Sequence, residues 1–181
     1  MGFVNPNNPM WCKDTHNLPL HAKTAIILTI SEYTKLHNGQ TLYMKIYQVS
    51  TSPLSGTKYS EVNKHASNIY SKIKKKTKRR PYIRSSYFNK GKIFLPLFWN
   101  HLYEKINHRD KTRRLKYFPC AIELIENSKF DPESKENVNK QSEILHRFAG
   151  KTKDGQLFFV QIKEEKKTGE KWLISVFPVD K

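Results

Sequence analysis

Positive charge is concentrated in one segment of this chain, residues 58–116. The segment holds 18 lysine or arginine residues and 3 aspartate or glutamate residues, a net charge of +15 within a total of +17. Residues 1–57 carry 4 basic and 2 acidic residues, and residues 117–181 carry 11 of each. A single dense block of cations, unlike evenly spread charge, provides a surface for a polyanion. The charge pattern therefore predicts a nucleic-acid partner, most readily RNA.

Size and composition predict a folded protein away from the membrane. The 181 residues are 37% hydrophobic and 12% aromatic, which is enough to bury a sizeable core. No apolar run reaches the length of a membrane span, and the first residues lack a signal-peptide pattern. The only cysteines, Cys12 and Cys120, do not form a disulfide framework. We expect a cytoplasmic protein with no membrane partner.

The histidines and cysteines do not form a metal-binding pattern. Seven histidines are scattered without a His-x-x-x-His pair, and no Cys-x-x-Cys pair occurs. Cys12, His16 and His21 resemble one half of a zinc site whose second half is missing. We therefore expect no metal and no cofactor.

The N-terminal third is the least regular part of the sequence. Residues 1–19 are rich in asparagine and proline and predict an irregular arm. Residues 24–49 fit either a buried helix or a β-hairpin, and the β-branched residues and the Asn38-Gly39 turn favour the hairpin. We divide the chain into an arm with a possible hairpin (1–57), a basic helix (58–83) and a C-terminal domain (84–181).

The basic helix is predicted from apolar residues at helical spacing that end at Pro81. These apolar positions are Val62, Ala66, Ile69, Tyr70 and Ile73. From Lys72 to Arg84 the chain holds 8 basic residues and no acidic one, and aromatic residues follow. Mixed cations and aromatic rings suit single-stranded RNA, and the alternatives are a solvated tract or a localisation signal. The candidate contacts here are Lys76, Arg79, Arg80, Arg84 and Tyr87.

The C-terminal domain is predicted to be α+β, with helices packed on one face of an antiparallel β-meander. We expect helices at 96–108 and 115–127, the second broken or bent at Pro119, and then a polar loop at 128–142. Strands are expected at 144–150, 156–163 and 171–179, with turns at Asp154-Gly155 and Thr168-Gly169.

Alternation along these strands predicts which side chains share a face. Phe158, Val160 and Ile162 are expected in the core, joined by Trp172, Ile174 and Val176. The opposite face then carries Phe159, Gln161, Lys163, Leu173, Ser175 and Phe177, together with either His146 or Arg147. A face with a cation, an amide, a hydroxyl and aromatic rings suits phosphate and a stacked base, and the alternative is an ordinary solvated face.

His101 is the candidate for proton transfer outside the sheet. Lys105 follows it by one helical turn, so the two side chains share a face of the predicted helix. A histidine beside cations is suited to acid/base chemistry near neutral pH, whereas a lone helical histidine is more often a surface residue.

Three segments of the C-terminal half resemble the phage and mobile-element branch of the barnase, EndoU, colicin and RelE-like (BECR) nuclease superfamily. The segments are Glu143 to Gly155 (EILHRFAGKTKDG), Phe158 to Lys163 (FFVQIK) and Ile174 to Pro178 (ISVFP). The resemblance covers roughly residues 84–181, and residues 1–83 have no counterpart. Members are mostly metal-independent ribonucleases, often toxins, so the resemblance also implies an acidic antitoxin or immunity protein as partner.

The resemblance implies a set of catalytic positions and a mechanism. The positions that match are His101 or Lys105 on a helix, His146 or Arg147 on the first strand, and Ser175 on a late strand. An RNA 2′-hydroxyl would attack the adjacent phosphate with histidine as acid or base and with cations offsetting the charge. Arg147, Lys151 and Lys163 would stabilise phosphate, and Gln161 and Ser175 would hold the substrate.

Two other functions fit parts of the same sequence. Asp154, Gln161 and Lys163 resemble a restriction-endonuclease-like core, in which a carboxylate and a glutamine hold Mg²⁺. A protein that binds nucleic acid without cutting it would also carry the basic block. Activity in EDTA separates the first alternative, and intact bound RNA separates the second.

Overall fold

The computed structural model describes residues 34–35, 41–42, 44–77 and 79–179. The predicted N-terminal arm, with Cys12, His16 and His21, therefore lies outside the described residues. Strand β1 (Thr34–Lys35) pairs antiparallel with β2 (Thr41–Leu42), as expected for a hairpin. The predicted Asn38-Gly39 turn between them is also outside the described residues.

The main sheet is open, with strand order β3-β7-β8-β9-β5-β4 and with β6 pairing on β7. Its strands are β3 (Ile46–Gln48), β4 (Tyr82–Ser85), β5 (Gly91–Phe94), β6 (Glu133–Asn137), β7 (Lys140–Lys151), β8 (Leu157–Glu165) and β9 (Lys171–Pro178). The three strands predicted near the C-terminus are confirmed as β7, β8 and β9, which pair antiparallel in chain order.

The sheet is mixed, unlike the antiparallel meander that we expected. β3 pairs parallel with β7, and β5 pairs parallel with β9. Both β3 and β5 precede helices in the chain, so each meets its partner strand only after a long crossover, as parallel pairing requires. The described chain is thus mixed α and β, and the segment after residue 44 joins the main sheet.

Two strand regions escaped the sequence prediction. β4 and β5 form an antiparallel hairpin in the stretch that we interpreted only as basic and aromatic. Its turn places Asn89 and Lys90 at φ of 49° and 62°, a left-handed conformation that asparagine adopts more easily than most residues. β6 lies in the predicted polar loop 128–142, because its pairing with β7 supplies order that its exposed side chains do not indicate.

The described residues contain one helix more than was predicted, α4, and the other helices differ from the predicted boundaries at their ends. They are α2 (Tyr59–Thr77), α3 (Pro96–Glu104), α4 (His108–Lys116) and α5 (Phe118–Asn127). The helix predicted over 96–108 ends early because Asn107 caps α4, its Oδ1 accepting from the Arg109 amide at 2.9 Å. Pro119 lies in the first turn of α5, where proline is favoured, and the helical segment is broken just before it, between α4 and α5. Within the described chain no helix has the length and apolarity of a membrane span.

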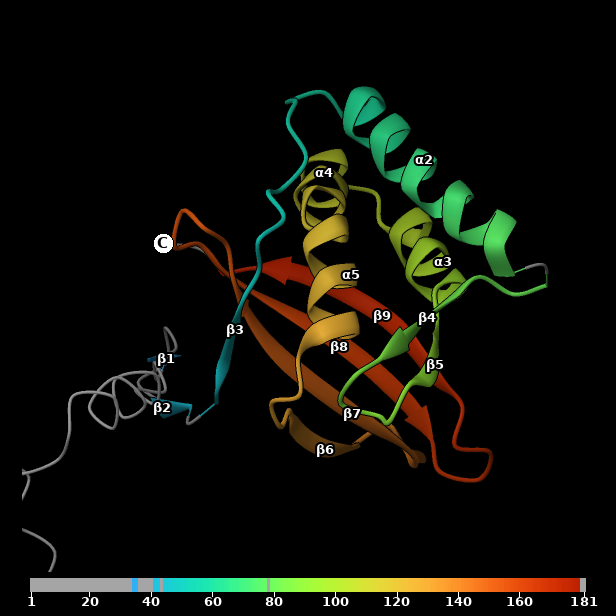
Figure 1. The fold of residues 1–181 in the computed structure, drawn as a ribbon. Helices are drawn as coiled ribbons and strands as arrows, with labels where there is room; N and C mark the ends of the chain where they lie inside the picture. Colours follow the sequence, from blue (N-terminus) through green and yellow to red (C-terminus); the bar gives the residue numbers. More distant parts are fainter. Residues whose placement is uncertain (1–33, 36–40, 43, 78, 180–181) are drawn as a thin grey trace, which may run out of the picture. The chain divides into compact units, whose positions relative to one another are not determined.

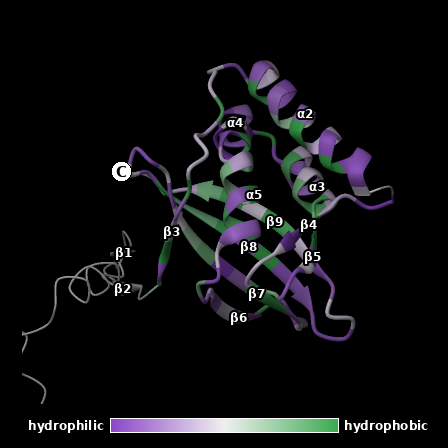
Figure 2. Cartoon of the chain, in the orientation of Figure 1, coloured by the Kyte–Doolittle hydropathy of each residue, from purple (hydrophilic) through white to green (hydrophobic). Residues whose placement is uncertain are grey.

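One face of the sheet is covered by helices, with α3, α4 and α5 lying in front of the strands in Figure 1. Val62 and Ala66 of α2 belong to the same buried cluster as Phe158 and Ile162 of β8. Hydrophilic stretches, purple in Figure 2, mark the rest of α2. The basic helix is therefore anchored on the shared core by a narrow apolar stripe.

A β-bulge in β9 changes which of its residues face the core. Gln161 pairs with Ser175 and Ile162 pairs with Leu173, so Ile174 is an extra residue on β9. Phe158, Val160, Ile162 and Val176 are buried as predicted, but Leu173 takes the core position expected for Ile174 or Trp172. Strict alternation fails here because the inserted residue shifts the register. The residues of β9 that precede it therefore face the opposite side from the one that alternation predicts.

Gly150 gives a prediction about packing between the sheet and α5. A Cβ added there would lie 2.6 Å from Leu124 Cδ1 and closer still to the Phe158 ring, inside van der Waals contact. We expect Gly150→Ala to lower the free energy of unfolding by about 1–3 kcal/mol through overpacking. Urea denaturation measures this, with Gln141→Ala on the exposed start of β7 as control. Equal stability of the two variants would contradict the close packing.

Candidate active site

A pocket of about 450 Å³ lies between α3, α4 and the bulged part of β9. Its polar lining is His101, Glu104, Lys105, Arg114, Gln161 and Ser175, and its apolar lining is Phe98, Leu102 and Ile174. These residues come from four elements and the short connection after α3. Four of the site residues predicted from the sequence, His101, Lys105, Gln161 and Ser175, line this one pocket.

The apolar face of α3 fixes the position of His101. Phe98, Trp99 and Leu102 are buried, so the helix is held against the core by one stripe. His101 lies next to this stripe and lines the pocket, half exposed, while Lys105 follows at the C-cap. The predicted sharing of one face by His101 and Lys105 therefore corresponds to a shared pocket wall.

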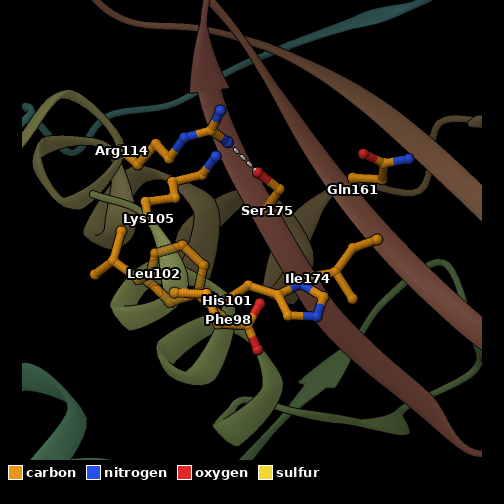
Figure 3. Close-up of a pocket in the computed structure, with 9 residues that line it drawn as sticks. Phe98, His101, Leu102, Lys105, Arg114, Gln161, Ile174 and Ser175 are labelled. Carbon is orange, nitrogen blue, oxygen red and sulfur yellow. Dashed lines mark hydrogen bonds between the residues drawn. The ribbon is translucent and has the colours of Figure 1, made fainter. Parts of the chain in front are cut away.

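Arg114 is held in the pocket by a carboxylate and a hydroxyl. Its Nε lies 3.0 and 3.1 Å from the two carboxylate oxygens of Asp110, and its guanidinium donates to Ser175 Oγ. Asp110 also lies 3.3 Å from Lys105 Nζ. Figure 3 shows the Lys105 and Arg114 side chains both directed toward Ser175. Burial opposes ionisation of Asp110, but its hydrogen bonds to Arg114 and Lys105 lower the pKa of this carboxyl.

A polar row crosses the open face of the sheet, opposite the main helix-covered core, and ends at this pocket, where Arg114 of α4 reaches Ser175. Arg147 is opposite Gln161 on β8, and Gln161 is opposite Ser175 on β9. The Arg147 guanidinium lies 5.7 Å from the Phe159 ring and 5.9 Å from the Phe177 ring, and its buried Nε has no hydrogen-bond partner within the described residues. Phe159 is buried in a cluster with Met44 and Ala149, so the row offers donors beside one partly exposed ring, Phe177.

His146 is buried on the other face of β7, the face that carries the core residue Phe148. Its Nε2 is 3.0 Å from Glu164 Oε2, its Nδ1 is 2.7 Å from Ser134 Oγ, and its ring contacts Phe88. Burial lowers its pKa, and the interaction with Glu164 opposes this only in part. Of the two neighbours left open by the sequence, Arg147 is the one that shares a face with Gln161 and Ser175.

Lys163 is on the open face but is engaged by a buried carboxylate. Its Nζ lies 2.9 Å from Glu143 Oε1, and Lys140 Nζ lies 2.8 Å from the same oxygen. Asn137 Nδ2 donates to the other oxygen at 2.9 Å. Burial by itself raises the pKa of Glu143, but these donors lower it to about 2.

The Glu143 cluster predicts acid sensitivity. The unfolded chain takes up this proton near the ordinary value of 4.5 and the folded chain only near 2, so ionised Glu143 stabilises the fold above pH 4.5. That contribution is lost as the pH falls from 4.5 towards 2. Urea midpoints measured across this range should fall more steeply for the natural protein than for Glu143→Gln. Parallel profiles would contradict the prediction.

The remaining predicted contact residues are dispersed. Arg80 pairs with Glu170 at 2.6 Å and lies over the Phe94 ring at 4.2 Å. Arg84 donates to the Lys90 carbonyl at 2.9 Å, near the edge of the sheet. Tyr87 packs on Phe88 and Phe148 in the helix-covered core. The others do not line the pocket: Lys76 in the last turn of α2, exposed Arg79, and Lys151 at the end of β7.

Sequence reasoning missed Glu104, Asp110 and Arg114. A signal for two of them was present, because residues 58–116 contain only 3 acidic residues, namely Glu61, Glu104 and Asp110. Two of these acids are at the pocket, one lining it and one holding its cations. Two of the three acidic residues in the basic segment are thus at the pocket, whereas most of its basic residues are not.

Comparison of the chain with protein-family models, with curated proteins and with solved structures gave no match. The BECR-like resemblance therefore stays a prediction, and the function is argued from this chain's own residues.

Proposed function

We propose that this protein is a metal-independent endoribonuclease that cleaves RNA by attack of a 2′-hydroxyl on the adjacent phosphate. One observation carries the proposal: an imidazole, a carboxylate, two cations, an amide and a hydroxyl line a single open pocket. This reaction needs a base, an acid and fixed positive charge around the phosphate. The net charge of +15 on residues 58–116 supports a polyanionic substrate.

Glu104 and His101 are assigned as the proton-transfer pair. They lie three residues apart on α3 and both line the pocket. The Glu104 carboxylate takes the proton of the 2′-hydroxyl as the new oxygen–phosphorus bond forms. The His101 imidazolium gives a proton to the 5′-oxygen as its bond to phosphorus breaks. The products are a 2′,3′-cyclic phosphate and a free 5′-hydroxyl.

Arg114 and Lys105 are assigned to the charge that develops on the phosphate oxygens. Asp110 is within 3.3 Å of Lys105 and 3.0 Å of Arg114, so both cations are held in place before substrate binds. Groups fixed in advance stabilise a transition state without reorganising during the reaction. Asp110 is in this scheme a positioning residue, because it acts through the two cations.

The open sheet face is assigned to the RNA strand next to the cleaved bond. Arg147 and Gln161 supply donors for phosphate or base edges, and the partly exposed Phe177 ring lies beside Arg147. Aromatic rings next to cations hold unpaired bases by stacking. The resemblance further predicts that an acidic antitoxin or immunity protein binds the basic residues of this protein.

The test is incubation of the purified full chain with an end-labelled single-stranded RNA in EDTA. Defined fragments that end in 2′,3′-cyclic phosphate are the expected result, and an RNA with 2′-O-methyl groups should stay intact. Cleavage that requires added Mg²⁺ would favour the alternative built on Asp154, Gln161 and Lys163. RNA that is retarded on a gel but never cut would favour a binding protein and overturn the catalytic assignments.

A further inference from the structure

A second pocket, of about 400 Å³, lies on a neighbouring side of α4. It is lined by Thr57, Tyr59, His108, Arg109, Thr112, Arg113 and Lys116. No carboxylate is among these lining residues, whereas Glu104 lines the first pocket. A concave site with several basic side chains and no acid favours an anion.

Helical spacing explains how α4 serves both pockets. Arg109, Arg113 and Lys116 are separated by four and three residues, so they lie along one face of α4. Arg114 lies on an adjacent face, where it meets Ser175 and lines the first pocket. Helix α4 therefore separates the two pockets and contributes cations to both.

The second pocket is held together by contacts from the start of α2 and from the loop before it. The Leu54 amide donates to the Lys116 carbonyl at 2.9 Å, which fixes the loop against the end of α4. The Tyr59 ring stands edge-on to His108 with centroids 5.0 Å apart, and Lys111 Nζ lies 5.8 Å from the Tyr59 ring. Burial raises the pKa of Tyr59, with a smaller effect of Tyr103, so its hydroxyl is a neutral donor at physiological pH.

We infer that this second pocket binds a phosphodiester group of the RNA strand, one or more nucleotides away from the bond in the first pocket. The inference rests on the proposed function for its choice of RNA. Because α4 separates the two pockets, a strand seated in both would pass over this helix. The enzyme would then prefer RNA longer than a dinucleotide, since a dinucleotide cannot reach the second pocket.

Binding is tested without cleavage, by fluorescence anisotropy of a labelled 2′-O-methyl RNA oligonucleotide at several salt concentrations. The Arg109→Gln/Lys116→Gln double variant should bind about tenfold or more weakly, with a salt slope lower by about 1–2. The control is Lys153→Gln/Lys167→Gln, which removes the same charge from exposed positions outside the pocket. Equal weakening in both double variants would overturn the inference, because net charge alone would explain it.

Two further measurements are needed. One distinguishes free phosphate from an RNA phosphodiester as the ligand, and the other distinguishes failure of this inference from failure of the proposed function. The first measurement uses inorganic phosphate as the probe. If phosphate binds the natural protein at this pocket but the double variant binds RNA normally, the site takes free phosphate and the RNA inference is wrong. If the natural protein cuts RNA, the double variant should raise KM for a long RNA and leave dinucleotide cleavage unchanged. If the natural protein cuts nothing, the proposed function fails while anisotropy still decides the second pocket. Single Arg109→Glu, at an exposed position, repeats the test should the double variant not fold.

Discussion

Replacing His101 with alanine is expected to lower the rate of RNA cleavage by about 100- to 10,000-fold, the usual contribution of a general acid or base. The imidazole is the group of the pocket assigned to protonate the leaving 5′-oxygen, and its neighbours are Glu104 of α3 and Lys105 at the C-cap. Loss of the leaving-group proton leaves an alkoxide to depart unaided. Binding of RNA should change little, because the cations of the pocket remain.

The measurement is single-turnover cleavage of an end-labelled RNA in EDTA. His65→Ala is the matched control, because His65 is an exposed histidine of α2 that does not line the pocket. Its rate should equal that of the natural protein. Equal rates for His101→Ala and the natural protein, with both variants folded, would remove His101 from the mechanism. A loss confined to KM would instead make it a binding residue.

Replacing Phe118 with alanine is expected to destabilise the fold by about 3–5 kcal/mol, the range for deleting a buried phenylalanine. Phe118 is fully buried at the start of α5, and its ring stacks on Phe98 with centroids 5.3 Å apart. It also meets the Trp99 ring at 5.6 Å. Since α3 carries both of these partners, the cavity would loosen the helix that presents His101.

Chemical denaturation measures this loss. A change of about 3–5 kcal/mol is a large part of the roughly 5–15 kcal/mol that stabilises most domains, so the variant should be partly unfolded at 37 °C. Phe130→Ala is the control, because 39% of Phe130 is exposed and its removal leaves no enclosed cavity. We expect a change below about 1 kcal/mol for that variant. Similar losses in the two variants would show that the α3–α5 contact is not the main source of the cost.

The fold was predictable where local pattern and tertiary pairing agree. Phe158, Val160 and Ile162 alternate as a strand must and are fully buried. The β6 strand was not predictable, because its residues are polar and its order comes from pairing with β7. The parallel pairs were missed for a similar reason. β5 and β9 are distant in sequence, and no local pattern in either strand indicates its partner.

The candidate site was predictable in part. His101 and Lys105 follow from helical spacing, and Gln161 follows from alternation along one strand. Ser175 was also placed on the correct face, but Leu173 was not, because the bulge at Ile174 changes the register of β9 between them. Arg114 could not be assigned from spacing, since its role depends on Asp110 beside it and on Ser175 across the pocket.

The sequence by itself determined the chemistry that is available to this protein: a basic central segment, an apolar stripe on α2, α3 and α5, and a hydrophobic face on β8. These features depend on residue type and on spacing along one element, which are local properties. Only the tertiary structure decided which side chains meet. Packing of α3 and α4 against the bulged edge of β9 brought His101, Arg114 and Ser175 into one pocket and left His146 on the opposite face of the sheet. Such meetings depend on long-range pairing and register, which no local pattern specifies.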